Sequence, residues 1–266
     1  MPNTLRDGRD DTPSAPHTIE FVDVSFRYPG SDAHVLRHIN LRFSAGTRLA
    51  LVGENGSGKT TLVKLLLRLY DPTEGEILLD GIDIRTYEYD AYLRLFSTVF
   101  QDFQLHAYSI RENLAFLQED CDAQLWQALE SNDIAGAIRK LPLGLDTYLT
   151  TELDEDGSDL SGGEKQKLAM ARACYKNAGF FVLDEPTAAI DPLAELRFFQ
   201  RIHETMRDKA ILFVSHRMAS TKFADEIIVL QHGEIVERGD YARLIEAGGV
   251  YATSFLMQAS LYQETV

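Results

Sequence analysis

The sequence has little of what marks several specialised protein classes. Only two of its 266 residues are cysteines, Cys121 and Cys174, and they lie far apart. Two such cysteines exclude a disulfide framework and a cysteine metal site, and they favour reduced thiols in a cytosolic protein. No apolar run approaches the ~18–20 residues that span a bilayer. The first sixteen residues carry arginines and aspartates instead of the apolar core of a signal peptide.

Positive charge is also scarce. Lys and Arg number 26 against 41 Asp and Glu, which gives a formal net charge of −15. A chain with this balance repels phosphate backbones unless it carries a dense basic patch, and the sequence shows none. We therefore expect no nucleic-acid partner. Hydrophobic residues make up 45% and charged residues 25% of the chain. These proportions are typical of a soluble globular protein and exclude a disordered or collagen-like chain.

Hydrophobic patterning predicts an α/β fold. Residues 1–17 are polar and contain three prolines, as in a flexible linker. Alternating or continuous apolar runs predict strands at 19–26, 39–43, 48–52, 180–183, 210–214, 226–230 and 234–237. After residue 61, apolar residues recur at helical spacing, which predicts a helix there. A second helix is expected over 192–207, and residues 102–172 look mainly helical. The pattern predicts a parallel sheet with a helical subdomain inserted at about 102–172, and a helical tail at 251–266.

A glycine-rich segment follows the strand expected at 48–52. Its sequence fits the phosphate-loop pattern: Gly53-Glu54-Asn55-Gly56-Ser57-Gly58-Lys59-Thr60. Gly56 and Gly58 let the backbone curl so that several N–H groups face one anion, and the next helix adds its positive end. Lys59 reaches the outer phosphates, Thr60 offers its hydroxyl to Mg²⁺, and Thr61 makes a further phosphate contact. The alternative is a glycine-rich turn without a ligand.

Two carboxylates follow the apolar run at 180–183. Asp184 at a strand end suits Mg²⁺ held through water, and Glu185 is placed to orient or deprotonate an attacking water. Taken alone, this pair is equally typical of a solvated acidic turn. The phosphate loop upstream favours the catalytic interpretation.

A second glycine-containing segment reads Leu160-Ser161-Gly162-Gly163-Glu164-Lys165-Gln166. It resembles the signature of the ATP-binding cassette family. The resemblance implies a P-loop NTPase (RecA-like) core, an antiparallel β subdomain and an inserted helical signature subdomain, over residues 18–250. It also implies two ATP molecules between two cassettes, with residues 160–164 facing the γ-phosphate held by the other cassette. The alternative is a helix that Ser161 merely caps.

Other residues match the family's motifs. Tyr28 resembles the aromatic residue that stacks on adenine, although alone it reads as a strand-edge packing residue. Gln101 resembles the glutamine that contacts Mg²⁺ or water and responds to the membrane domain. Asp191 resembles the aspartate that bridges two cassettes, or else caps a helix before Pro192. His216 resembles the histidine that touches the γ-phosphate, where a lone histidine is more often structural.

Three stretches are similar to the exporter branch of the family. They are Phe26-Arg27-Tyr28-Pro29-Gly30, residues 101–113, and Thr151-Glu152-Leu153-Asp154-Glu155-Asp156-Gly157. Glu155 matches an acidic residue of that branch, whereas Asp154 stands where glycine is usual and His106 where an apolar or aromatic residue is common. The last stretch would otherwise be a solvated acidic loop. The groove for a membrane partner is expected at Phe103, Leu105 and Tyr108.

The resemblance implies an ATP hydrolase that uses ATP and Mg²⁺ to power export. Its partners would be a second cassette and a transmembrane domain, fused or separate. That domain would hold this chain, soluble when isolated, at the cytoplasmic face of the membrane. We expect an isolated domain of a longer chain or a separately encoded half. Two alternatives are a soluble cassette acting on nucleic acid or ribosomes, which the charge of −15 disfavours, and a nucleotide-binding module without turnover.

Overall fold

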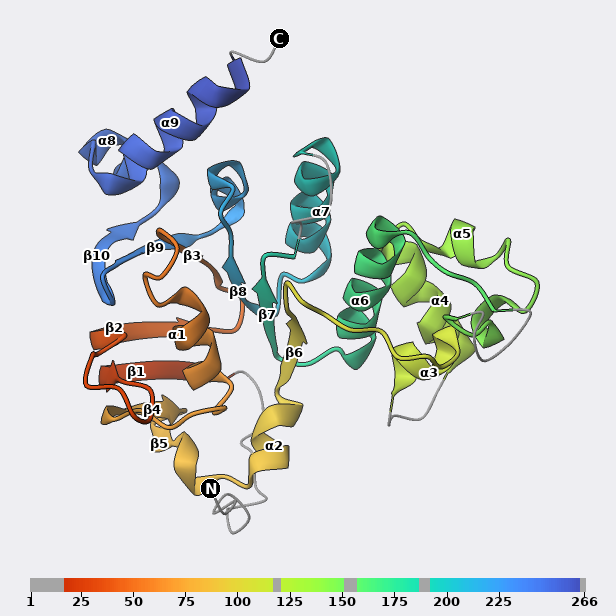
Figure 1. The fold of residues 1–266 in the computed structure, drawn as a ribbon, viewed down its shortest axis with the longest axis horizontal. Coiled ribbons are helices and arrows are strands. Elements are labelled where there is room, and N and C mark those ends of the chain that lie inside the picture. The colour runs from red at the N-terminus through yellow and green to blue at the C-terminus, as the bar shows by residue number, and fades with distance from the viewer. Residues whose placement is uncertain (1–16, 117–120, 151–156, 187–191, 264–266) are drawn as a thin grey trace. The chain divides into compact units, whose positions relative to one another are not determined.

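The computed structural model describes residues 17–116, 121–150, 157–186 and 192–263 (Figure 1). The chain divides into two compact units, which are described separately. The first comprises Met1–Phe96, Gly179–Asp184 and Met206–Val266. The second comprises Ser97–Ala178 and Glu185–Thr205.

An antiparallel sheet forms one part of the first unit. Its strand order is β2-β1-β4-β5. The strands are β1 (Thr18–Phe26), β2 (Leu36–Ser44), β4 (Glu74–Leu79) and β5 (Ile82–Asp83). Successive side chains of β1 point to opposite faces of the sheet, and Ile19 and Phe21 lie on the buried face. The pairing of β1 with β2 shifts register after Phe21, and this shift brings Val24 to the buried face. Asp23, with a φ of 51°, lies in this bulge and sharpens the twist of the strand.

A mainly parallel sheet carries the strands that lead into the expected site. Its order is β10-β9-β3-β8-β7-β6. The strands are β3 (Arg48–Val52), β6 (Phe96–Val99), β7 (Phe180–Asp184), β8 (Ala210–Val214), β9 (Glu226–Gln231) and β10 (Glu234–Gly239). Strands β9, β3, β8 and β7 pair in parallel, and β10 returns antiparallel to β9. All residues of β7 and β8 are buried, as expected from their continuous apolar sequences. The predicted α/β class is confirmed.

The two sheets of the first unit meet where β2 begins. The backbone N–H of Arg37 donates to the carbonyl oxygen of Gly233, in the turn between β9 and β10, at 2.8 Å. The helices of this unit are α1 (Lys59–Leu66), η1 (Ile84–Thr86), α2 (Tyr89–Arg94), η3 (Met218–Phe223), α8 (Tyr241–Ala247) and α9 (Val250–Gln263). Four apolar side chains of α1 are fully buried, so this helix is part of the core: Leu62, Val63, Leu65 and Leu66.

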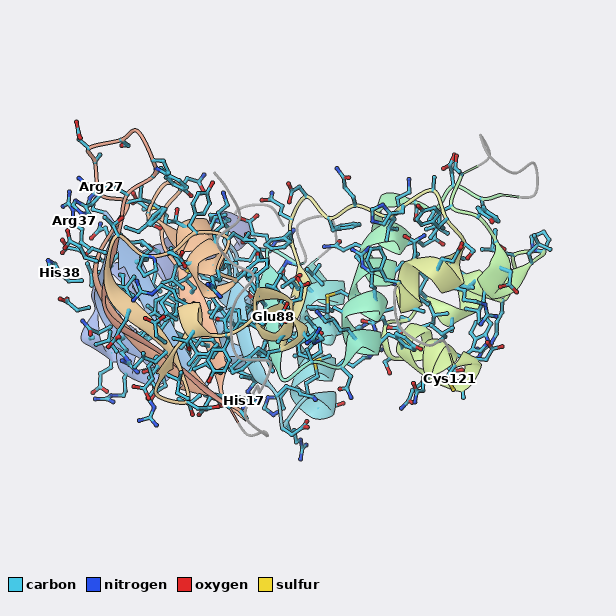
Figure 2. All side chains as sticks on the ribbon, turned by 90° about the horizontal axis from the view of Figure 1, so that it is seen from below. His17, Arg27, Arg37, His38, Glu88 and Cys121 are labelled. Carbon is cyan, nitrogen blue, oxygen red and sulfur yellow. The ribbon has the colours of Figure 1, made fainter. Side chains whose placement is uncertain are left out.

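His17 is the first described residue and belongs to the packed part of the first unit (Figure 2). Its ring is buried, lies 2.8 Å from the Asp80 carboxylate through Nδ1, and stacks on Phe180. The expected linker at 1–17 therefore ends in a residue held by the core, and residues 1–16 lie outside the described part.

The second unit is mainly helical, and the subdomain expected at about 102–172 falls inside it. Its helices are α3 (Ile110–Ala115), α4 (Asp122–Ser131), α5 (Ala135–Ile138), η2 (Gly144–Asp146), α6 (Gly162–Lys176) and α7 (Pro192–Thr205). Leu114, Leu125 and Leu168 join α3, α4 and α6 in one buried cluster. Cys121, just before α4, is exposed (Figure 2).

Candidate nucleotide-binding site

The glycine-rich loop runs from the end of β3 to the start of α1, and two close approaches explain its glycines. A Cβ atom on Gly53 would lie 2.1 Å from the carbonyl oxygen of Leu230 in β9. A Cβ atom on Gly58 would lie 2.6 Å from a methyl carbon of Leu36 in β2, and the φ of Gly58 is 107°. A larger residue at either position would push the loop away from the sheets. Glycine therefore lets the backbone pass between β2 and β9.

Polar groups of this loop are suited to hold an anion. The Lys59 ammonium group donates to the carbonyl oxygens of Gly53, at 2.8 Å, and Glu54, at 2.9 Å, so it curls back over the loop. The Ser57 hydroxyl is buried and has no hydrogen-bond partner among the described residues. The first amides of α1 have no partner inside the helix and form its positive end. A phosphate group would supply partners for these donors.

Strand register brings three parts of the predicted site to one edge of the parallel sheet. Leu51 of β3 and Asp184 of β7 both pair with Val214, the last residue of β8. The phosphate loop, Asp184 and His216 therefore all lie at the carboxyl ends of neighbouring parallel strands. Ligands of open α/β sheets bind at this edge. The side chain of Asp184 is only 7% exposed, and that of His216 is half-buried.

Glu185 directly follows β7 and has an unusual backbone. Its φ is 50°, in the left-handed region, and its side chain is half-buried. A non-glycine residue in this region costs on the order of 1–2 kcal/mol and persists where the surrounding structure imposes it. The turn at Glu185 changes the direction of the chain immediately after the strand end. Such strain is concentrated at functional sites.

Tyr28 belongs to an aromatic cluster in the first unit. Its ring packs edge-on against Phe26 at 5.0 Å and Tyr70 at 5.2 Å. Its hydroxyl lies 3.1 Å from the hydroxyl oxygen of Thr61 in α1. Lys64, one turn further along α1, has its ammonium group 5.8 Å from the ring centre. Tyr28 therefore lies beside the helix that begins in the phosphate loop.

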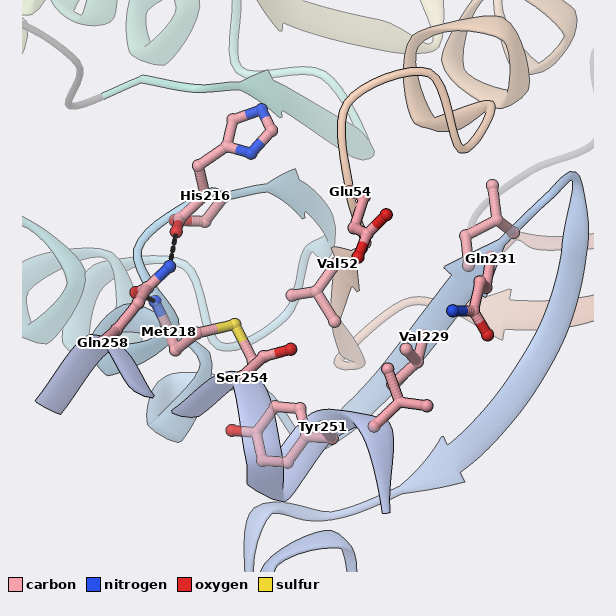
Figure 3. Close-up of a pocket in the computed structure, with 13 residues that line it drawn as sticks. Val52, Glu54, His216, Met218, Val229, Gln231, Tyr251, Ser254 and Gln258 are labelled. Atoms are coloured by element: carbon pink, nitrogen blue, oxygen red, sulfur yellow. Dashed lines mark hydrogen bonds between the residues drawn. The ribbon is translucent and has the colours of Figure 1, made fainter. Parts of the chain in front are cut away.

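A pocket of about 180 Å³ lies beside the phosphate loop in the first unit (Figure 3). Gly53 and Glu54 line it from the loop, and His216 lines it from the segment after β8. The far wall comes from α9, which contributes Tyr251 and Gln258. The C-terminal helix thus shares a pocket with the loop and with His216.

The segment 160–164 begins α6 in the second unit. Ser161 is the N-cap, and it forms a capping box in which its hydroxyl accepts from the Glu164 N–H while the Glu164 carboxylate accepts from the Ser161 N–H at 2.9 Å. Hydrogen bonds from the Ser161 hydroxyl and N–H lower the pKa of Glu164. Leu160 is buried in the helical core, whereas Gly162 and Gly163 have open space where a Cβ would lie. The glycine backbone is therefore accessible at this helix end.

Gln101 lies in the second unit and is exposed. The side-chain amide of the buried residue Asn113 holds the chain at residues 106–109, shortly after Gln101. Asn113 of α3 accepts from the N–H of His106 and donates to the carbonyl oxygens of His106, Tyr108 and Ser109. This amide fixes the loop that carries the expected docking groove. Phe103 and Leu105 are half-buried there, and Tyr108 is 52% exposed.

The predicted site residues are distributed over both units. The loop residues 53–61, Tyr28, Asp184 and His216 belong to the first unit, and Gln101, Glu185 and residues 160–164 to the second. Asp191, Glu155 and Asp154 lie outside the described residues. Sequence reasoning missed the roles of Asn113 and Tyr70. The Ser-x-x-Glu spacing at 109–112 and at 161–164 was a readable signal for the helix starts of α3 and α6.

Comparisons with known proteins show which family the chain belongs to. A family model described as "ABC transporter" matches residues 36–188, more than half of the chain. The subtilin transport ATP-binding protein SpaT of Bacillus subtilis is 39% identical over 241 residues, which cover 88% of this chain and 39% of that protein. An ATP-dependent lipid A-core flippase of Aromatoleum aromaticum is 40% identical over 242 residues, covering 90% of this chain and 40% of that protein.

A solved structure, described as a bacterial Atm1-family ABC exporter with ATP bound, aligns with a TM-score of 0.85 and 32% identity. The alignment covers 93% of this chain and 43% of the exporter chain. This chain thus spans about two fifths of the length of the relatives it matches. Within the described residues, no helix has the length and apolar character needed to cross a bilayer. The chain belongs to the ABC transporter family, and its fold is that of the family's P-loop nucleotide-binding domain.

Proposed function

We propose that this chain binds and hydrolyses ATP and thereby powers an export transporter. The observation that carries the proposal is the phosphate loop. There the buried Ser57 hydroxyl has no hydrogen-bond partner in the part of the chain that the structure describes, and the Lys59 ammonium group is folded over the loop carbonyls. These donors match the negative charge and the many oxygens of a triphosphate. The backbone of Gly53, Asn55, Gly56 and Gly58 would contribute further N–H groups, and Thr61 a hydroxyl.

The chain also offers oxygen donors for Mg²⁺. Thr60 is exposed at the start of α1, and Asp184 lies at the same sheet edge as the loop. Hydroxyl and carboxylate oxygens are the ligands that this cation prefers, so the residues present fit it. Gln101 would complete the set from the second unit. When bound, Mg²⁺ neutralises charge on the β- and γ-phosphates.

Hydrolysis needs a water molecule positioned to attack the γ-phosphorus atom and groups that stabilise the charge that develops on the phosphate oxygens. Glu185 would orient the water and accept its proton, because its carboxylate follows the strand that ends in Asp184. His216 would donate to a γ-phosphate oxygen as the terminal P–O bond breaks. Lys59 and the loop amides hold the leaving diphosphate. Positioning and electrostatics supply most of the rate in such a site.

The Tyr28 ring would stack on the adenine. Tyr28→Ala should raise the Kd for ATP about 5- to 150-fold, because stacking on a base contributes ~1–3 kcal/mol. Tyr28→Phe keeps the ring and should bind ATP nearly as well as the parent chain. Calorimetric titration with ATP and with inorganic triphosphate checks the assignment. Equal losses for both ligands in Tyr28→Ala would contradict it, because inorganic triphosphate has no base to stack.

The second anion site, at Ser161 and its two glycines, would complete the site of another cassette. ATP would then be held between the phosphate loop of one chain and residues 160–164 of its partner, with Asp191 bridging the two. ATP favours the closed dimer and hydrolysis releases it, which is a population shift between two states. The names of the similar proteins, a transport ATP-binding protein, a flippase and an exporter, support coupling of this cycle to a transmembrane partner. The segment 103–108 would form the contact with that partner. Such a partner would hold the chain at the cytoplasmic face of the membrane.

Solution mass tests the composite site. Glu185→Gln, which should retain ATP, is expected to form dimers with Mg·ATP and remain monomeric without it. Adding Ser161→Arg or Ser161→Asp should abolish the dimer by bulk or by repulsion of the γ-phosphate. Asp also caps helices well, so Ser161→Asp controls for loss of the cap. Gln124→Arg, on an exposed position of α4, should dimerise normally. Dimers that survive both Ser161 changes would refute the composite site.

A further inference from the structure

The C-terminal helix holds the segment that carries His216. The side-chain amide of Gln258 in α9 donates from Nε2 to the carbonyl oxygen of His216, at 2.6 Å. Its Oε1 accepts from the backbone N–H of Met218, at 2.9 Å. Figure 3 shows the amide on one side of this segment and the imidazole of His216 pointing away from it. One side chain thus fixes the backbone on both sides of Arg217.

Two further hydrogen bonds of this segment are local. The Ser215 hydroxyl accepts from the N–H of Arg217, at 3.0 Å, and lies 2.9 Å from the hydroxyl oxygen of Ser220. These bonds shape the turn between β8 and the start of η3. Gln258, 40 residues further along the chain, attaches it to α9. The backbone at His216 and Met218 is therefore tied to α9.

Helix α9 is itself firmly anchored. The Tyr251 side chain is fully buried, and its hydroxyl lies 2.6 Å from that of Thr221 in η3. The carboxylate of Glu237 in β10 accepts from the N–H groups of Val250 and Tyr251, at 2.6 and 3.0 Å, and so caps the helix start. Burial raises the pKa of Tyr251, so this hydroxyl keeps its proton at neutral pH. Gln258 lies two turns beyond Tyr251, on the same helix face.

We propose that Gln258 is a positioning residue for the hydrolysis step, which it serves by holding the His216 backbone. The role rests on the proposed contact of His216 with the γ-phosphate. The chemistry of the contact requires an amide, because one group must accept from Met218 and another must donate to the His216 carbonyl. Leucine satisfies neither backbone group. A glutamate carboxylate can accept from the Met218 N–H, but its second oxygen would face the His216 carbonyl oxygen with no proton to donate.

The test compares Gln258→Leu and Gln258→Glu in the 266-residue chain. Both should lower kcat about tenfold with KM for ATP unchanged, because misplacing a group that acts in the transition state lowers kcat. Hydrogen exchange of the Met218 amide should accelerate at least tenfold in Gln258→Leu and stay slow in Gln258→Glu, as expected for loss or retention of its acceptor. Ser260→Ala, at an exposed position of α9, is the matched control and should behave as the parent chain.

A double-mutant cycle separates this inference from the proposed function. If Gln258 acts through His216, Gln258→Leu should lower kcat in the parent chain but not in His216→Ala. Normal turnover in His216→Ala would overturn the role of His216, and the positioning role with it. A slow His216→Ala beside a fully active Gln258→Leu would overturn the positioning role alone. So would an equal loss from Gln258→Leu in both backgrounds.

Discussion

Glu185→Gln should lower phosphate release by about 10²–10⁴-fold, the usual contribution of a positioned general base, while ATP binding is retained. The amide has the shape of the carboxylate but accepts no proton from water. The affinity for ATP should remain, because the loop, Lys59 and Asp184 are unchanged. Single-turnover phosphate release measures the first effect, and calorimetric titration of ATP measures the second.

Glu204→Gln is the matched control for this loss. Glu204 is exposed near the end of α7, and its replacement removes a carboxylate at a distance in sequence from the strand end. Phosphate release should be unaffected there. Release at the parent rate in Glu185→Gln would contradict a general-base role. The positive φ of Glu185 would then have to be explained by the turn alone.

The sequence was most informative where one local rule decided the structure. Strands β7 and β8 are buried on both faces, and their unbroken apolar runs predicted this. The phosphate loop was predicted from the spacing of its glycines, and the structure supplies the reason, since Leu230 and Leu36 exclude a side chain at Gly53 and Gly58. Glycine positions of this kind can be predicted from the sequence, because the backbone conformation there accepts only glycine.

Long-range packing was not readable from the sequence. Strand β4 begins with Glu74, Gly75 and Glu76 and shows little alternation, so only its pairing with β1 makes it a strand. Strand β6 has four residues, too few for a period to be seen. Tertiary partners override weak local preference in such cases.

The same limit applies to side chains in and around the site. Nothing in the sequence links His17 to Asp80, Tyr28 to Tyr70, or His216 to Gln258, because each pair is far apart along the chain. Motifs predicted which residues could carry the chemistry. The contacts that hold those residues in place emerged only from the fold. A capping box was the exception, since its two residues are three positions apart.

Lys59→Ala should weaken ATP binding by at least about 100-fold, the second large effect that we expect. A charge-assisted hydrogen bond contributes ~1.5–3 kcal/mol, and a largely buried ammonium group near a triphosphate adds Coulomb attraction in a site of reduced dielectric. Lys59 is only 5% exposed, so water screens this interaction little. Titration of ATP monitored by calorimetry measures the change in Kd.

The control for Lys59→Ala must separate lost charge from a collapsed loop, because the ammonium group also bonds the carbonyl oxygens of Gly53 and Glu54. Lys140→Ala, at an exposed lysine of the second unit, should leave the Kd unchanged. Lys59→Arg keeps the charge but not the compact three-donor geometry. If charge alone governs binding, Lys59→Arg should recover most of the affinity. If the fit of the ammonium group to the loop matters as well, Lys59→Arg should bind almost as weakly as Lys59→Ala. ATP binding at the parent Kd in Lys59→Ala would show that the triphosphate is not held by this loop.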